Sequence, residues 1–220
     1  MIRRRLVRRW ARCLDTRLFL AIFALGSLGV CQQQTTRPTV SKQPLTAEDL
    51  AIYAAVIHGW VDDGKHPVHI AMLTEPLHVE DSAGCSKTPL GKADSNVVHR
   101  FRKEDLAQLG SSMIELVDPD AQSLEIEKND PGRAIRNGAS VDDAVRNGFA
   151  HGMVTLSEIR FDMKHEHAIV WYGFRCGGLC GNGGTVLMEK KDGKWRRGKS
   201  CGVWMSERRI TSVLPVAMDS

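Results

Sequence analysis

The sequence lacks the short motifs that mark the commonest catalytic sites. It contains no HExxH pair for a catalytic zinc ion, no GxSxG turn for a nucleophilic serine, and neither GxGxxG nor GxxxxGK[ST] for a nucleotide. Ser157 falls within an expected strand, where a hydroxyl group is more often hydrogen-bonded within the sheet than activated as a nucleophile. These absences disfavour the corresponding enzyme classes, and we expect no cofactor.

The chain also lacks an excess of basic residues outside its first thirty positions. Its formal net charge is +4, yet residues 1–30 contain seven arginines and a single acidic residue, Asp15. Residues 31–220 then hold 23 basic and 25 acidic side chains. Because nucleic-acid-binding domains present a basic surface, this balance argues against nucleic acid as a partner.

The apolar run near the N-terminus is short. LFLAIFALGSLGV, residues 18–30, follows the arginine-rich leader MIRRRLVRRWARCLDTR. As a helix the run would span roughly 20 Å, less than the ~30 Å hydrocarbon core of a bilayer. This layout predicts an export signal sequence over residues 1–30, with a retained signal anchor as the alternative.

Cys31 follows this run directly. Leu28-Gly29-Val30-Cys31 resembles a bacterial lipoprotein box, in which the cysteine is acylated, although Val30 replaces the usual small residue. Ordinary cleavage after Gly29 is the alternative, but it would leave an odd number of cysteines in an oxidising compartment. We therefore expect a lipid on Cys31 that anchors the chain on the periplasmic side of a bacterial membrane.

A polar segment, residues 31–44, is expected to tether this anchor to one folded domain, residues 45–220. The domain should begin with an amphipathic helix over 46–62, because Thr46 and Asp49 form a capping pair and apolar residues recur at helical spacing. Tyr53 and Trp60 lie on that apolar stripe and are expected in the core.

The middle of the chain gives weaker signals. A strand is predicted over 68–74 and is followed by a loop that carries Cys85. A second helix is predicted from the apolar residues Val98 to Leu109, capped by Ser95 and ended by Gly110. Asp-Pro and Asn-Gly turns suggest a short strand near 124–126, and Ser140 should cap a short helix that ends at Gly148.

The last seventy residues alternate as strands do. The segments 153–161, 167–174 and 185–191, with a final stretch from Trp195 to Trp204, are separated by short polar turns, and Asp192-Gly193 favours a type I′ hairpin. A helix should cover one face of these strands. The sequence therefore predicts an α+β fold, in which N-terminal helices pack on a C-terminal antiparallel β-meander.

These segments carry a resemblance. "GMVTLSEIRFD", "HAIVWYGFRCGGLCGNGGTVLMEKKDGKW" and the closing "VWMS" resemble a loose family of exported, lipoprotein-like bacterial proteins without an established activity. The terminal hairpin, with its tryptophan, is also similar to the last strands of NTF2-like domains. The resemblance implies a fold and an exported location, and it brings no catalytic residues with it.

Four cysteines remain after the signal and Cys31. Cys176 and Cys180 enclose Gly-Gly-Leu, and in an exported protein such a pair usually forms a disulfide. We prefer Cys176 with Cys180, which leaves Cys85 with Cys201, while a cross-pairing stays open. A redox site would instead need an exposed thiolate of low pKa, usually in CxxC at a helix start.

Two histidine pairs are candidate metal ligands. His66 and His69 form HxxH, and His165 and His167 flank Glu166, but each pair supplies only two ligands and we expect no metal site. A basic run on the last hairpin, with Trp195 as a core anchor within it, could contact anionic lipid or glycan or simply be solvated. The run comprises Lys190, Lys191, Lys194, Arg196, Arg197 and Lys199.

From these patterns the sequence favours an exported envelope protein that binds or maintains structure without catalysis. Its expected partners are the membrane, through the N-terminal anchor, and an envelope protein or a glycan. One alternative is an envelope hydrolase or thiol oxidoreductase that uses Cys176 and Cys180 or His165 and His167. The other is an inhibitor or immunity-type protein for a secreted partner.

Overall fold

A computed structural model describes residues 38–61, 67–77, 85, 91 and 96–206, all of which belong to one compact unit that begins at Arg37. The expected signal sequence, Cys31, His66 and Ser95 lie outside the described residues. Within the segment expected to be a tether, Thr39–Val40 forms a short strand, β1, which pairs in parallel with β3, Val97–Val98. No described helix is long and apolar enough to span a bilayer.

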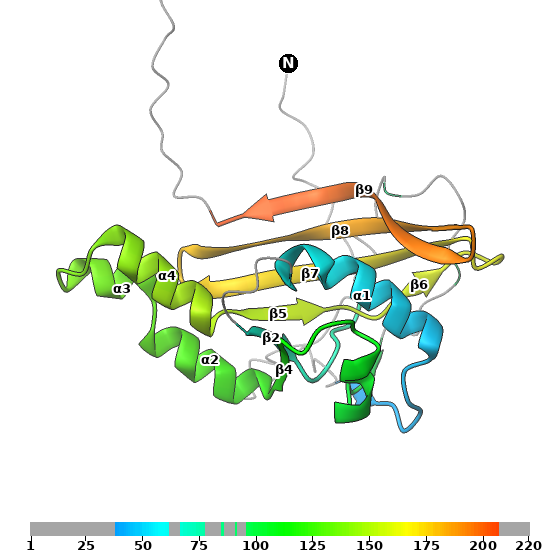
Figure 1. Cartoon of the computed structure of the whole chain (residues 1–220), viewed down its shortest axis with the longest axis horizontal. Helices are drawn as coiled ribbons and strands as arrows, with labels where there is room; N and C mark the ends of the chain where they lie inside the picture. Colours follow the sequence, from blue (N-terminus) through cyan, green and yellow to red (C-terminus); the bar gives the residue numbers. More distant parts are fainter. Residues whose placement is uncertain (1–37, 62–66, 78–84, 86–90, 92–95, 207–220) are drawn as a thin grey trace, which may run out of the picture. The chain divides into compact units, whose positions relative to one another are not determined.

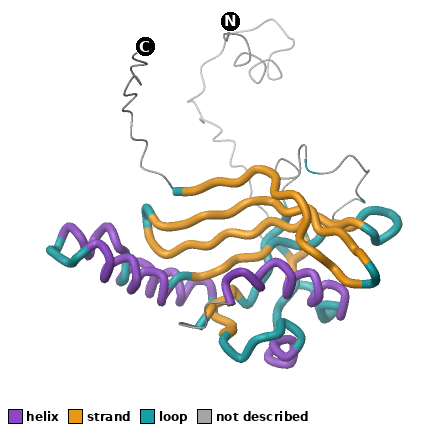
Figure 2. Tube along the Cα trace, turned by 45° about the horizontal axis from the view of Figure 1, so that its top comes forward, coloured by secondary structure: helices purple, strands orange, loops and turns teal. Residues whose placement is uncertain are grey.

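The main sheet has the order β4-β2-β5-β7-β8-β9, and β6 pairs with β7 beside this path. Figure 1 shows the sheet with helices placed around it, and Figure 2 shows its long strands running side by side. The strands are β2 (Val68–Ala71), β4 (Ile114–Val117), β5 (Met153–Leu156), β6 (Arg160–Phe161), β7 (His167–Gly177), β8 (Cys180–Lys191) and β9 (Lys194–Met205).

The α+β fold class is confirmed, and the meander of β7, β8 and β9 is antiparallel as expected. At its last turn Asp192 and Gly193 have φ values of 52° and 73°, which suits the expected type I′ hairpin. The sheet is nevertheless mixed, because β2 pairs in parallel with both β4 and β5.

The helices are not all N-terminal, which corrects the expectation. Only α1 (Ala47–Val61) precedes the main sheet, whereas α2 (Pro119–Lys128), α3 (Pro131–Arg136) and α4 (Val141–His151) lie in the middle of the chain. The expected capping pair forms at the start of α1, where the Thr46 hydroxyl accepts from the Asp49 N–H at 3.1 Å and the Asp49 carboxylate accepts from the Thr46 N–H at 2.8 Å.

The expected strand near residues 124–126 is wrong, because these residues belong to α2. Asp118-Pro119 and Asp130-Pro131, which suggested turns, instead begin α2 and α3. Each aspartate caps the helix by accepting from backbone N–H groups, and each proline occupies the first turn, where its missing N–H is not needed. An Asp-Pro step serves equally well as a turn and as a helix start.

The helix expected over residues 98–109 is also wrong. Val98 lies in β3, and only a 3₁₀ helix, Lys103–Ala107, follows. The apolar residues still fill the core, because Val98, Phe101 and Leu109 are buried. The short helix after Ser140 is confirmed as α4, which extends to His151 beyond the expected end, and Ser140 accepts from the Asp143 N–H at 3.2 Å.

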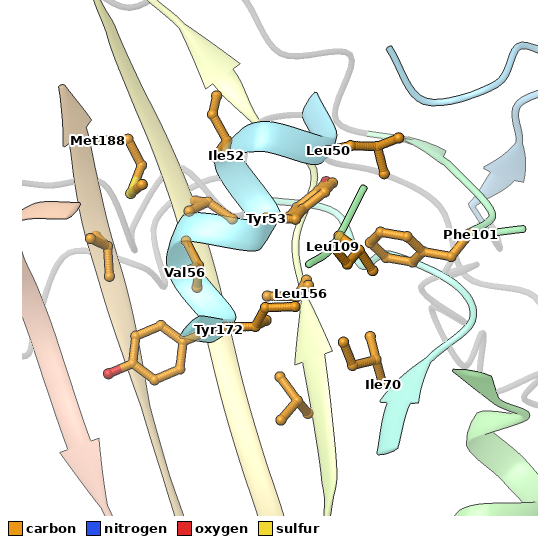
Figure 3. Close-up of a cluster of buried hydrophobic side chains, with 14 of the residues drawn as sticks. Leu50, Ile52, Tyr53, Val56, Ile70, Phe101, Leu109, Leu156, Tyr172 and Met188 are labelled. Atoms are coloured by element: carbon orange, nitrogen blue, oxygen red, sulfur yellow. The ribbon is translucent and has the colours of Figure 1, made fainter. Parts of the chain in front are cut away.

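Helix α1 covers one face of the sheet, here called the α1 face. Figure 3 shows α1 lying between Met188 and Tyr172 of the strands on one side and Phe101 and Leu109 on the other. The buried Tyr53 hydroxyl donates to the carbonyl of Ser157 at 2.9 Å. This helix is the expected cover, and it shares a buried cluster with Ala168, Val170 and Tyr172 of β7. The ring of Phe174 lies 5.2 Å from that of Phe149 on α4.

The other face of the sheet, here called the opposite face, is covered in part. Ile169 of β7 and Leu187 of β8 pack against Leu77 and against Cys85, which is bonded to Cys201 of β9. At the other end of the same face Ile126 of α2 packs on Ala71 and Met153. Between these two covers the described residues leave a groove on the opposite face.

Candidate functional site

The glycine-rich hairpin between β7 and β8 is closed by a disulfide. The structure joins Cys176 to Cys180 and Cys85 to Cys201, the pairing that the sequence favours. Cys176 is 1% exposed, and the turn between the two cysteines presents Leu179, which is 56% exposed. The disulfide therefore fixes the end of the hairpin and leaves the sulfur of Cys176 buried.

Asp130 anchors this hairpin end to α3. Its carboxylate accepts from the Gly178 N–H at 2.6 Å and from the Arg133 N–H at 2.7 Å. A Cβ at Gly177 would lie 2.6 Å from the Asp130 carboxylate, so glycine permits this close approach. The hydrogen bond from Gly178 is the main cause of a lowered pKa at Asp130, and Arg136 and Arg133 lower it further.

Glycines of β7 and β8 also make room for two tryptophans on the opposite face. A Cβ at Gly173 would lie 2.5 Å from the indole of Trp171, and a Cβ at Gly183 would lie 2.6 Å from Nε1 of Trp204. Gly173 and Gly183 are direct partners across β7 and β8. The two indoles therefore lie over paired positions of the sheet, where any side chain would displace them.

These tryptophans border a groove of about 780 Å³ on the opposite face. Thr155 and Gly173 line it from the sheet, Asp118 and Ser123 line it from the start of α2, and Trp204 lines it from β9. The remaining lining residues are Pro38, Ala71, Leu73, Thr74, Glu75, Pro119, Asp120, Met153, Trp171, Phe174 and Arg175. The groove thus combines indole surfaces with carboxylates, hydroxyls and one guanidinium.

Arg175 is held at the edge of this groove. Its Nη2 donates to the Ser123 hydroxyl of α2 at 2.5 Å. Arg175 also lines a second cavity of about 570 Å³ together with residues of α2 and α3. The two cavities therefore share Arg175.

The described histidines among the candidate metal ligands contact carboxylates, a carbonyl or a ring. His167 lies 2.9 Å from the Asp162 carboxylate, and His165 lies 3.2 Å from Glu48 and stacks on Phe161. His69 lies 3.2 Å from the carbonyl of Gly152. Within the described residues no three His, Cys, Asp or Glu side chains are grouped as metal ligands would be.

The carboxyl group of Asp162 is strongly perturbed. Its side chain is 3% exposed, and burial by itself would raise the pKa. Hydrogen bonds from the His167 ring and from the backbone N–H groups of Glu166 and His167 outweigh that effect and lower the pKa to about 2. The carboxylate thereby fixes the turn between β6 and β7, which is a structural role.

Ser157 is engaged in the sheet. Its hydroxyl donates to the carbonyl of Glu158 at 2.8 Å and accepts from the Trp171 N–H at 2.9 Å. Both hydrogen-bonding partners belong to the backbone, and the residue is buried. Ser157 therefore positions the strand that carries Trp171.

The basic hairpin is tied to the body at two points. Lys190 forms an ion pair with Glu48 of α1 at 2.7 Å, and buried Trp195 donates to the same carboxylate at 3.3 Å. Burial would raise the pKa of Glu48, but hydrogen bonds from Lys190 and His165 lower it. Arg197 Nη2 donates to the Tyr172 hydroxyl at 3.0 Å. Trp195 is thus the expected core anchor.

Sequence reasoning identified the disulfides but missed the groove. The alternation along β7 does place Trp171, Gly173 and Arg175 on one face, and this signal was available. The position of Trp204 over Gly183 depends on the register of β9 against β8, which shifts between Gly183 and Thr185. The contribution of α2 was hidden because its residues suggested turns.

Searches against protein-family models, curated proteins and solved structures return no match to this chain.

Proposed function

We propose that the chain is an exported binding protein of the bacterial envelope, held at the periplasmic side of a membrane by a lipid on Cys31, and that its ligand occupies the groove beside Trp171 and Trp204. The N-terminal signal pattern and the two disulfides support export. The resemblance of the glycine-rich hairpin to exported lipoprotein-like proteins points the same way.

The observation that carries the binding role is the pair of indoles over paired glycines. Trp204 is 41% exposed, so burial of its apolar surface stabilises the fold less than burial of a core tryptophan would. Backbone space is nevertheless reserved for its ring at Gly183 and for the Trp171 ring at Gly173. Aromatic surface beside a few polar groups in a concave site is the usual composition of a ligand site.

Binding is favoured over the enzymatic alternatives by the state of their residues. A thiol oxidoreductase would need an accessible sulfur, whereas Cys176 is buried in a disulfide. A histidine base would need a nucleophile beside its free ring nitrogen. His165 and His167 contact Glu48 and Asp162 through Nδ1, and among the described residues no serine or cysteine is hydrogen-bonded to the other ring nitrogen of either histidine. These pairs support a structural use of both residues.

The location is tested by the intact mass of full-length protein purified from the envelope of a bacterial host. We expect acyl chains that are lost in Cys31→Ser, and four thiols that alkylate only after reduction. An unlipidated wild-type chain would refute the tether at Cys31. Alkylation of Cys176 or Cys180 without reduction would favour the thiol oxidoreductase.

The binding role is tested by photo-crosslinking in cells. A benzophenone amino acid at Asp120, on the groove, should give a discrete adduct that disappears when Trp204→Ala is added. The matched control places the same group at exposed Asp192, on the last hairpin turn. Adducts that are the same at both positions, or that persist in Trp204→Ala, would contradict a ligand in the groove.

A further inference from the structure

The second cavity adds a basic region next to the groove. Arg133 and Arg136 of α3 and Arg175 of β7 line this cavity of about 570 Å³, here called the arginine pocket. Arg175 also lines the groove, so the two cavities are adjacent and share this residue. A ligand in the groove can therefore reach the arginine pocket without leaving the surface of the protein.

The guanidinium groups of the arginine pocket form no close ion pair among the described residues, although Arg133 and Arg136 lie near enough to Asp130 to lower its pKa. Within the described residues the guanidinium groups of Arg133 and Arg136 form no ion pair or hydrogen bond, and Arg175 donates only to the neutral Ser123 hydroxyl. Two carboxylates, Glu127 and Asp130, also line the pocket. The Asp130 oxygens already accept the N–H groups of Gly178 and Arg133, which fixes that carboxylate to the backbone.

Guanidinium groups bind carboxylate, phosphate and sulfate through two parallel hydrogen bonds. Three of them around one cavity therefore fit an anionic substituent. The adjoining groove offers different chemistry, because the exposed indole of Trp204 presents a flat apolar surface and Ser123, Thr155 and Asp120 present hydroxyl and carboxylate groups. A sugar ring has matching surfaces, since its C–H groups form an apolar face and its hydroxyls donate and accept at the edge.

We propose that the ligand of the groove is an acidic saccharide. One sugar ring stacks on Trp204, and its carboxylate or phosphate substituent binds Arg175 with Arg133 and Arg136. This inference rests on the proposed function and specifies the ligand class. A neutral saccharide would leave the arginine pocket unused, whereas the carboxylates that line the groove can accept hydrogen bonds from ring hydroxyls.

The test is a titration of the purified folded chain, followed by tryptophan fluorescence and by calorimetry. The probes are an oligogalacturonate, a neutral galactose oligosaccharide of the same length, inorganic phosphate and oligolysine. We expect the oligogalacturonate to bind roughly tenfold more tightly than the neutral oligosaccharide at low salt, with the difference shrinking as salt is added. A phosphorylated oligosaccharide tests whether phosphate serves better than carboxylate.

The variants separate the two parts of the site. Arg133→Ala with Arg136→Ala should abolish the preference for the acidic saccharide, whereas Trp204→Ala should weaken both saccharides. Arg146→Ala is the matched control, because this exposed arginine of α4 pairs with Asp143 and lines neither cavity. Circular dichroism spectra of all variants should match that of the wild type.

Several outcomes would overturn the inference. The first is equal affinity for neutral and acidic saccharides, and the second is no saccharide binding at all. The third is a preference for oligolysine. The fourth is binding of inorganic phosphate with an affinity that Trp204→Ala does not change and that no saccharide exceeds. None of these refutes a ligand in the groove, because the crosslinking at Asp120 tests that claim independently of ligand class.

Discussion

The two halves of the β7–β8 hairpin differ in side-chain size. The packed half, Ala168–Tyr172 with Thr185–Met188, is covered on the α1 face by α1 and on the opposite face by Leu77 and Cys85. The glycine half, 173–184, contains all six glycines of the hairpin and borders both cavities. The same pair of strands thus supplies stability at one end and a ligand surface at the other.

The largest test of this comparison concerns the two disulfides. Cys85–Cys201 closes a loop of 116 residues over the packed half, whereas Cys176–Cys180 spans four residues in the glycine half. Since the chain entropy removed from the unfolded state grows with loop length, replacing the first pair by alanine should lower the free energy of unfolding by about 5 kcal/mol, and replacing the second by about 2 kcal/mol.

Urea unfolding of both double variants, with the wild type in reducing and non-reducing buffer, measures these costs. Equal losses for the two pairs would show that the cover over the packed half contributes no more than the hairpin turn. The fully reduced wild type should be less stable than either variant.

Met188→Ala tests the packed half alone. Met188 is fully buried under α1, so its truncation should cost about 2–5 kcal/mol through lost burial and a residual cavity. Ligand affinity in the folded protein should not change, because Met188 lies on the α1 face. Thermal unfolding and saccharide titration of the same sample measure both quantities, and reduced affinity in a folded variant would show that the two faces are coupled.

Gly183→Ala tests the glycine half. The added Cβ would lie 2.5 Å from the carbonyl of Tyr172 and 2.6 Å from Nε1 of Trp204, so the indole must move. We expect a stability loss of roughly 1–3 kcal/mol from overpacking and a larger relative loss of ligand binding, which reverses the pattern of Met188→Ala. Gly193→Ala, at the distant turn where φ is 73°, is the control for a stability loss from backbone strain that leaves Trp204 in place. Unchanged Trp204 fluorescence and affinity in Gly183→Ala would contradict the reserved space.

The difference between the halves also explains what the sequence could reveal. In the packed half, large apolar residues on both faces, such as Ile169 and Val170, predict a strand that is buried on both sides. In the glycine half, the cysteine pair predicts a disulfide. A glycine has no side chain to indicate its neighbour, so Gly183 could not reveal Trp204. The side of the groove formed by α2 could not be predicted either, because Asp118-Pro119 is compatible both with a turn and with the start of a capped helix.

Asp162 offers the smallest and most specific test, since it holds the turn that leads into the packed half. Its pKa is lowered to about 2 in the folded protein from an ordinary value of 3.8, so the charged form stabilises the fold. This contribution is fully present above pH 3.8 and is lost as the pH falls toward 2. Asp162→Asn should therefore be less stable than the wild type at neutral pH, and the gap should narrow below pH 3.8. Urea unfolding across this range measures the gap, with Asp192→Asn at the exposed hairpin turn as the control. If the difference in free energy of unfolding stayed constant down to pH 2, Asp162 would act through packing and not through its charge. The turn between β6 and β7 would then be held by its shape.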